Sequence, residues 1–156
     1  MPKQSAGLMM YRRRGDAVEV FLVHPGGPYW AKKDKGAWTV PKGEYDQNED
    51  ALAAARREFE EETGFQPSGE MEELGTVKQK SGKVVRAWAF AGDCDPARLK
   101  SNTCAIEWPP RSGRQISIPE VDAGRWFRME EARAYIREEQ RALLDALGRM
   151  IADETS

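Results

Sequence analysis

The most informative part of this 156-residue chain is the segment 43–65, which reads GEYDQNEDALAAARREFEEETGF. Its middle is built of Ala, Leu, Glu and Arg, which have high helix propensities. Asn48 can cap the first turn through its side-chain oxygen, two acidic residues follow it, and Gly64 stands just past the end. These start and stop signals predict a helix over residues 48–63.

Three glutamates share one edge of this predicted helix. At about 100° per residue, Glu58 and Glu62 lie within roughly 40° of each other, and Glu61 lies about 60° further round on the side of Glu58. The adjoining arc is apolar, so the carboxylates are predicted at the border between a buried and an exposed face, on the rim of a cleft. The apolar arc consists of Ala51, Leu52, Ala55 and Phe59.

Such a row of like charges destabilises a helix by about 0.2 to 0.5 kcal/mol for each pair three or four residues apart. A divalent cation would offset the repulsion, and Mg²⁺ and Mn²⁺ both prefer carboxylate oxygens. The alternative is a solvated helix in which Arg57 pairs with Glu61, or Arg56 with Glu60, in surface contacts worth little. Helix composition alone favours this alternative, and only the wider sequence pattern speaks against it.

The whole segment resembles the Nudix box, the sequence signature of a family of hydrolases. The matching positions are Gly43-x5-Glu49-x7-Arg57-Glu58-Phe59-x-Glu61-Glu62-x-Gly64-Phe65. The resemblance implies an α+β fold, an α/β/α sandwich with a mixed central sheet, in which the box forms a loop–helix–loop catalytic element. It also implies a divalent cofactor, Mg²⁺ or Mn²⁺.

The resemblance also implies roles for single residues of the box. Glu58, Glu61 and Glu62 would bind the metal. Arg57 would orient a carboxylate without touching the metal, and Lys42 would contribute its backbone carbonyl as a further ligand. A water molecule held by the metal would then attack one phosphorus of a phosphoanhydride.

A second segment, 120–127, reads EVDAGRWF and resembles the part that supplies an additional carboxylate in some members of the family. Glu120 is therefore a second candidate, beside Glu58, for the base that takes a proton from the attacking water. Asp122 is a weaker candidate for the same role. A solvated loop charge after Pro119 is the ordinary alternative for Glu120.

The apolar pattern of the remaining chain predicts a mixed or largely antiparallel sheet. Residues 6–11 and 18–23 are two apolar runs joined by a charged turn, which is typical of a strand pair. Residues 24–37 have no period and are expected to form a surface loop. Apolar residues at near-helical spacing over residues 129–152 predict one or two helices, with a break near Arg137. Further strands are expected at residues 38–40, 73–79, 83–91, 104–108, 115–118 and 125–128.

Basic residues near the box indicate a phosphate-rich substrate. Lys42, Arg111 and Arg114 are candidates to bind phosphate oxygens through charge-assisted hydrogen bonds. The segment 38–43, WTVPKG, resembles the one in diadenosine polyphosphate hydrolases and diphosphoinositol polyphosphate hydrolases of the family. This resemblance implies long, highly charged phosphate chains.

Two tryptophans remain open as stacking platforms for a base. Trp108 precedes the turn that carries the two arginines, and Trp30 lies in the long loop before the box. Aromatic residues are more often part of the core, which is the role expected for Trp88 in its apolar strand. His24 is the only histidine, and a hydrogen bond at the end of a strand is expected for it rather than catalysis.

Composition and charge limit the partners. Lys and Arg number 24 and Asp and Glu 26, so no global basic field draws the chain to nucleic acid or an anionic membrane. No apolar run approaches the roughly 20 residues that span a bilayer. The two cysteines lack metal-ligand spacing and the N-terminus lacks a secretory signal, which favours the cytoplasm. We expect one domain over residues 1–156 and no stable nucleic-acid partner, and the family resemblance allows a homodimer.

We therefore expect an enzyme that uses Mg²⁺ or Mn²⁺ to hydrolyse a phosphoanhydride bond in a nucleoside diphosphate linked to another group. Dinucleoside polyphosphates and (deoxy)nucleoside triphosphates are the favoured substrates. Two alternatives stay open. A non-catalytic nucleotide sensor would keep the fold without turnover, although the intact row of carboxylates argues against it. An interaction protein with an acidic docking helix would show no metal dependence.

Overall fold

The strand pair predicted from the first two apolar runs forms the centre of the fold. In the computed structural model, which describes residues 4–155, β1 (Gln4–Arg14) and β2 (Ala17–Pro25) run antiparallel. The turn between them contains Gly15 at φ 63°, a left-handed conformation that glycine adopts without steric penalty. The predicted pair is confirmed, and both strands extend beyond the predicted residues.

The main sheet is mixed. β5 (Val84–Ala91) runs parallel to β1, and β4 (Glu72–Lys78) pairs antiparallel with β5. On the other side, β8 (Val121–Arg128) pairs antiparallel with β2, and the short β3 (Lys42–Glu44) pairs with the start of β1. The strand order is β4-β5-β1-β2-β8, with β3 beside β1. The mixed sheet and the hairpin β4–β5 are therefore as predicted.

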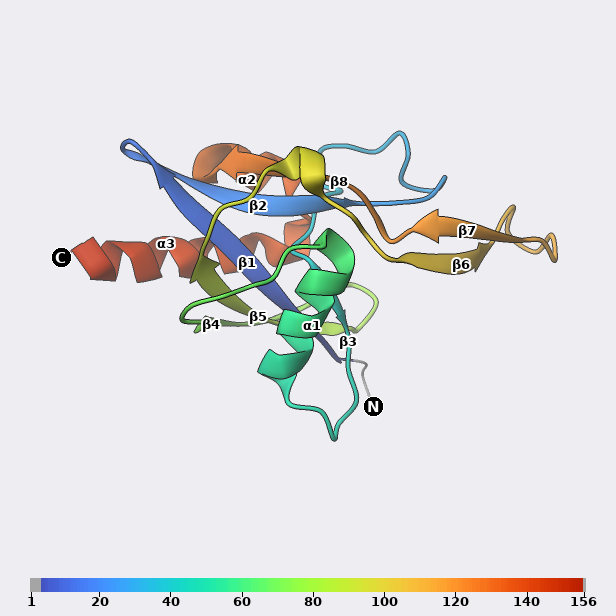
Figure 1. Ribbon diagram of the computed structural model, residues 1–156, viewed down its shortest axis with the longest axis horizontal. Coiled ribbons are helices and arrows are strands. Elements are labelled where there is room, and N and C mark those ends of the chain that lie inside the picture. Colours follow the sequence, from blue (N-terminus) through green and yellow to red (C-terminus); the bar gives the residue numbers. More distant parts are fainter. Residues whose placement is uncertain (1–3, 156) are drawn as a thin grey trace.

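Helices cover both faces of this sheet (Figure 1). α1 (Ala51–Thr63) packs on one face, whereas α2 (Met129–Tyr135) and α3 (Arg141–Thr155) pack on the other. This arrangement is the α/β/α sandwich that the box implied. Within residues 4–155, none of the helices is long and apolar enough to cross a membrane.

Successive residues of the central strands face opposite cores, as the period of two in a strand requires. In β1, Leu8 and Met10 belong to the core that contains Phe59 of α1. Met9 and Tyr11 belong to the core formed with α2 and α3. Because both faces are buried, β1 reads as a continuous apolar run rather than as an alternating one.

The C-terminal region forms two helices with the expected break between them. A short 3₁₀ helix, η2 (Glu138–Gln140), lies in the break. Arg137 donates its backbone N–H to the Trp38 carbonyl at 2.8 Å, and the buried side chain of Gln140 accepts from the Val40 N–H at 3.1 Å. These bonds tie the break to the segment that leads into β3.

The predicted start of the box helix is wrong. The helix begins at Ala51, and Asp50 rather than Asn48 is its N-cap, since the Asp50 carboxylate accepts from the Ala53 N–H at 2.9 Å. Asp and Asn cap helices about equally well, so helix propensity does not choose between them. The chain before Asp50 folds into a turn, which directs the Glu49 side chain toward the helix.

Residues 38–40 do not form the predicted strand, because they bridge two different neighbours. Thr39 pairs with β2, whereas Trp38 pairs with Ile136 in the break between α2 and α3. A regular ladder begins only with β3. Pro41 precedes it and has no N–H to extend a ladder, so the chain changes partners at this point.

A two-stranded ribbon extends from the body of the protein (Figure 1). β6 (Thr103–Glu107) and β7 (Gln115–Pro119) pair antiparallel, close to the predicted ranges. A 3₁₀ turn, η1 (Pro96–Arg98), precedes the ribbon. Residues 108–114 connect the two strands and form the tip of the ribbon.

Candidate active site

The apolar face of α1 turns the row of glutamates toward β3. Ala55 and Phe59 are fully buried against the sheet. Glu58 and Glu62 adjoin this face and are only 8% and 7% exposed. Glu61 remains at the surface, with 41% of its side chain exposed. Two of the three carboxylates are thus buried more deeply than the cleft rim predicted from the helix pattern.

Glu58 packs directly against the first glycine of the box. A Cβ atom at position 43 would overlap the Glu58 carboxyl group, so only Gly43 lets α1 approach β3 this closely. Next to it, the Lys42 N–H donates to Glu62 Oε1 at 3.2 Å. Both inner carboxylates therefore meet the backbone of β3.

Burial makes these carboxylates harder to ionise. It raises the pKa of Glu62 to about 8, although the nearby Lys42 opposes the effect. The pKa of Glu58 is raised as well, first by burial and then by the charge of Glu61. Burial also lowers the pKa of Lys42, despite the neighbouring carboxylate. The charge of one lysine therefore does not compensate the two buried carboxylates, whereas a divalent cation would favour their ionised form.

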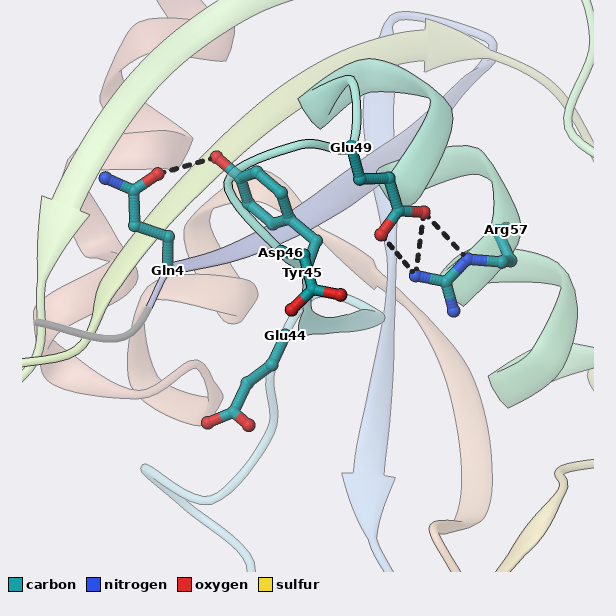
Figure 2. A pocket seen from close by; sticks show the side chains of 6 residues that line it. All are labelled: Gln4, Glu44, Tyr45, Asp46, Glu49 and Arg57. Atoms are coloured by element: carbon teal, nitrogen blue, oxygen red, sulfur yellow. Dashed lines mark hydrogen bonds and ion pairs between the residues drawn. The ribbon is translucent and has the colours of Figure 1, made fainter.

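Arg57 links the two ends of the box (Figure 2). Its Nε donates to Glu49 Oε2 at 3.1 Å and its Nη2 to Glu49 Oε1 at 3.2 Å, a bidentate contact with the turn before α1. Its Nη1 donates to Glu58 Oε1 at 2.9 Å and to Glu61 Oε1 at 3.4 Å. A single guanidinium therefore holds the loop and two of the carboxylates, which is the contact that its predicted orienting role requires.

A cavity of about 310 Å³ lies beside this arginine, before the start of α1. The Tyr45 hydroxyl donates to Gln4 Oε1 at 2.8 Å at its edge (Figure 2). Its lining is rich in carboxylates, which disfavours an anionic polyphosphate. The residues that line it are Gln4, Glu44, Tyr45, Asp46, Glu49 and Arg57.

A series of backbone hydrogen bonds holds Glu120 near α1. The Asn102 N–H donates to the Glu61 carbonyl at 2.8 Å, and the Glu120 N–H donates to the Asn102 carbonyl at 3.0 Å. The Ser101 hydroxyl accepts from the Val121 N–H at 3.0 Å. The backbone of the segment before β8 is thereby tied to the C-terminal end of the glutamate helix.

A second cavity, of about 220 Å³, brings together residues that the sequence predicted separately. Glu62 from α1, Lys42 from β3 and Glu120 from the segment before β8 all line it. It is therefore our candidate for the place of reaction. The complete lining is Pro25, Trp30, Thr39, Lys42, Glu62, Glu120, Val121 and Arg137.

Asp122, the weaker candidate for the base, has a different partner. Its Oδ1 lies 2.8 Å from Nδ1 of His24, whose Nε2 lies 2.6 Å from the Lys33 carbonyl. The hydrogen bond expected for His24 at the end of its strand is confirmed. This pair lies where β2 meets β8, and neither residue lines the 220 Å³ cavity.

The carboxylates around α1 suit a hard divalent cation, which prefers oxygen ligands. Among residues 4–155, however, no three acidic, histidine or cysteine side chains are grouped closely enough to hold a metal ion. Glu58 and Glu61 are bound to the Arg57 guanidinium, and Glu62 accepts from the Lys42 N–H. The donor chemistry fits Mg²⁺ or Mn²⁺, and binding would require carboxylates to turn from their present partners.

Three residues predicted to bind substrate lie elsewhere. Trp108, Arg111 and Arg114 belong to the tip of the β6–β7 ribbon, which extends away from α1 (Figure 1). The Trp108 N–H donates to the Arg114 carbonyl at 2.9 Å, and the Arg111 N–H donates to Glu107 Oε1 at 2.8 Å. Both hydrogen bonds thus stay within the ribbon. None of the three residues lines the 220 Å³ cavity.

Arg137 and Trp30 also line the cavity. The sequence left Trp30 open as a stacking platform for a base and gave Arg137 no role in a site. The Arg137 guanidinium lies 5.2 Å from the centroid of the Trp30 ring. In the sequence, Arg137 marks only a helix break, and the position of Trp30 in a long loop does not show which residues it faces. Their proximity to α1 is a tertiary contact that no local pattern signals.

Comparison with known proteins places this site in a family. The NUDIX domain family matches residues 1–147. The chain is 32% identical over 122 residues to the asymmetrical bis(5′-nucleosyl)-tetraphosphatase of Rattus norvegicus, covering 69% of this chain and 79% of that protein. It is 30% identical over 109 residues to the RNA pyrophosphohydrolase of Rhizobium meliloti strain 1021, covering 60% of each.

A further relative, an uncharacterised 17.7 kDa protein of Enterobacteria phage T4, is 33% identical over 89 residues. That alignment covers 55% of this chain and 58% of the phage protein. The chain therefore spans less than two thirds of the phage and Rhizobium relatives.

Solved structures support the same fold. The C. elegans Ap4A hydrolase in a binary complex superposes with a TM-score of 0.66 at 23% identity, covering 96% of this chain and 98% of that one. The NUDIX domain of Shewanella oneidensis NrtR, solved with ADP ribose, gives a TM-score of 0.66 at 15% identity, covering 96% and 89%. At these identities the likeness concerns the fold alone.

Proposed function

The chain belongs to the NUDIX domain family, and on that basis we propose that it is a divalent-metal-dependent pyrophosphohydrolase. Its substrate would be a nucleoside diphosphate linked to a further group. The prediction of an enzyme is supported by the family match over residues 1–147 and by relatives named as a tetraphosphatase and a pyrophosphohydrolase.

The observation that carries the proposal is the burial of Glu58 and Glu62 against β3 with too little positive charge around them. An uncompensated buried carboxylate costs free energy, so a purely structural role would be filled better by a neutral side chain. Mg²⁺ or Mn²⁺, when bound, would neutralise phosphate oxygens and lower the pKa of an attacking water.

The protein's own residues supply the remaining roles in this proposal. Glu58 or Glu120 accepts the proton of the attacking water. Arg57 keeps Glu58 in position through the 2.9 Å contact of its Nη1. Lys42 lines the cavity. Its ammonium group would bind a phosphate oxygen, and its backbone carbonyl would be the further ligand of the metal.

For the substrate we favour a dinucleoside polyphosphate, with nucleoside triphosphates as the second class. Support comes from the WTVPKG segment at residues 38–43 and from the rat relative, a bis(5′-nucleosyl)-tetraphosphatase. The Rhizobium relative, an RNA pyrophosphohydrolase, makes an RNA end the third class to test. A sensor that binds nucleotides without hydrolysing them remains the competing proposal.

The experiment that tests the function measures phosphate release and identifies the products, with and without Mg²⁺ or Mn²⁺. The panel contains diadenosine polyphosphates, nucleoside triphosphates, ADP-ribose, diphosphoinositol phosphates and triphosphorylated RNA. We expect metal-dependent turnover of one class that is abolished in Glu62→Gln and retained in Glu60→Gln. Glu60 is a matched control because it lies on the same helix but is exposed.

Two other results would contradict the proposal. Metal-dependent binding of nucleotides without turnover of any compound would favour the sensor. If neither binding nor activity depends on the metal, the result would favour the interaction protein. Circular dichroism of each variant separates loss of chemistry from loss of fold.

A further inference from the structure

The 220 Å³ cavity has a wall that the proposed reaction does not use. Trp30 belongs to the loop between β2 and β3, and Arg137 belongs to the break between α2 and α3. They lie in the same cavity lining as Glu62 and Lys42. The wall therefore faces any substrate whose reacting bond lies beside the inner carboxylates.

The backbone of Arg137 is fixed, and the residue lines the cavity. Its backbone is held by the bond from its N–H to the Trp38 carbonyl at 2.8 Å and by the Gln140 N–H to its own carbonyl at 2.9 Å. Its Nε is buried and has no hydrogen-bond partner among the described residues. The ion pair with Glu139 spans 3.6 Å, which is too long for a hydrogen bond. Because the buried Nε faces Glu139, a phosphate in the cavity would bind the two terminal nitrogens of the guanidinium.

Trp30 offers a flat aromatic face beside this cation. Its ring lies 5.2 Å from the Arg137 guanidinium on one hand and 5.2 Å from Lys33 Nζ on the other. The neighbouring ring of Tyr29 packs edge-on at 5.0 Å and is 58% exposed. Aromatic rings stack on nucleobases, and a base that stacks on Trp30 would take the place of one of the two cationic side chains over the ring.

We propose that Arg137 and Trp30 form a nucleotide subsite, in which Arg137 binds a phosphate next to the bond that is cleaved and Trp30 stacks on the base. This inference rests on the proposed function, because that function identifies the bond that is cleaved beside Glu62. Arg137 suits phosphate because a guanidinium is a planar cation that can donate two parallel hydrogen bonds to phosphate oxygens.

The size of the cavity determines which part of the ligand it encloses. Sites that surround a whole small ligand measure about 300 to 1,000 Å³. At about 220 Å³, this cavity is smaller, so in our proposal it holds the phosphates and the base extends from it along the half-buried Trp30. The two residues therefore recognise two different parts of one nucleotide, and their contributions can be separated by choice of probe.

Calorimetric titration with ADP, GDP and tripolyphosphate, each in EDTA and in Mg²⁺, tests the subsite without requiring turnover. We expect Arg137→Gln to weaken binding of all three probes by about tenfold or more, the loss of a charge-assisted hydrogen bond. Trp30→Ala is expected to weaken ADP and GDP by about tenfold and to leave tripolyphosphate unchanged, because only the nucleotides carry a base.

Conservative variants and a remote control make the test specific. Arg137→Lys and Trp30→Phe are expected to bind with intermediate affinity, since each keeps part of the contact. Arg149→Gln removes an exposed arginine of α3 outside this cavity and should bind as the wild type does. Wild-type protein that binds neither ADP nor GDP, or Arg137→Gln and Trp30→Ala variants that are folded and bind normally, would overturn the subsite.

Kinetics separates this inference from the proposed function. If the wild type turns over a substrate, Arg137→Gln and Trp30→Ala should raise KM more than they lower kcat. Normal kinetics in both variants would disprove the subsite and leave the function standing. Absence of turnover, with nucleotide binding that depends on Arg137 and Trp30, would disprove the function and leave the subsite standing.

Discussion

The two walls of the 220 Å³ cavity are built in opposite ways. The α1 wall contributes Glu62 to the lining, with Glu58 one turn earlier on the same helix, and Arg57 holds this helix to the turn that precedes it. A second wall takes Trp30, Glu120 and Arg137 from three segments that are far apart in the sequence. The first wall is therefore a local structure, and the second exists only in the folded chain.

This difference separates chemistry from recognition. The α1 wall concentrates carboxylates that suit a metal, so changes there should lower kcat. The second wall carries, besides Glu120, an aromatic ring and a guanidinium, so changes of Trp30 and Arg137 should alter KM and the choice of substrate. The variants below test whether that division holds, beginning with the one for which we expect the largest effect.

Glu58→Gln is expected to lower kcat by about 10²- to 10⁴-fold, the range contributed by a general base or its equivalent. The substitution keeps the shape of the side chain but removes its charge. Steady-state kinetics at saturating Mg²⁺ provides the measurement, and thermal unfolding should show a folded protein. An unchanged rate would refute the role of Glu58. If Glu120→Gln instead causes the large loss, Glu120 is the proton acceptor.

Gly43→Ala is expected to lower kcat by about 100-fold, because an added methyl group overlaps the Glu58 carboxyl group and displaces it by a distance that catalysis does not tolerate. Gly148→Ala in α3 is the matched control, since a Cβ there meets only Met129 at an ordinary 3.9 Å. Alanine in the middle of a helix should stabilise this control by about 0.5 to 1 kcal/mol. Equal activity of the two variants would show that the close approach at Gly43 is unimportant.

Arg57→Lys is expected to lower kcat by about tenfold, a smaller loss because the charge remains while the bidentate contact with Glu49 and the link to Glu58 are broken. Arg56→Lys is the control, as Arg56 is exposed one position earlier on the same helix. When activity is titrated with Mg²⁺, Arg57→Lys alone should need a higher Mg²⁺ concentration for half-maximal activity, because its carboxylates bind the metal more weakly. If both variants behave alike, Arg57 has no orienting role.

The double variant Arg111→Gln, Arg114→Gln is expected to have the smallest effect. For a mononucleotide its KM should change by less than about fivefold, because an exposed charge contributes at most ~1 kcal/mol. The tip of the ribbon lies away from α1 (Figure 1), so only an extended substrate would reach both places. A larger rise in KM for a long polyphosphate or an RNA end would support the substrate role predicted for these arginines.

Local periodicity made part of this protein predictable. The relative positions of Glu58, Glu61 and Glu62 follow from 3.6 residues per turn, whatever the helix packs against. The continuous apolar runs of β1 and β2 likewise indicated strands, and the break near Arg137 followed from an interrupted helical period. The start of α1 was harder, because Asn48 and Asp50 are equally good caps and only the fold chose Asp50.

The sequence by itself determined the elements, the spacing of the carboxylates and the family to which they belong. The tertiary structure decided how deeply Glu58 and Glu62 are buried, which residues meet Glu62 in one cavity, and that the arginines of the ribbon tip do not line the cavity that contains Arg137. The physical reason is that spacing along a helix or strand is set by backbone geometry, whereas burial and contact between distant segments depend on how whole elements pack.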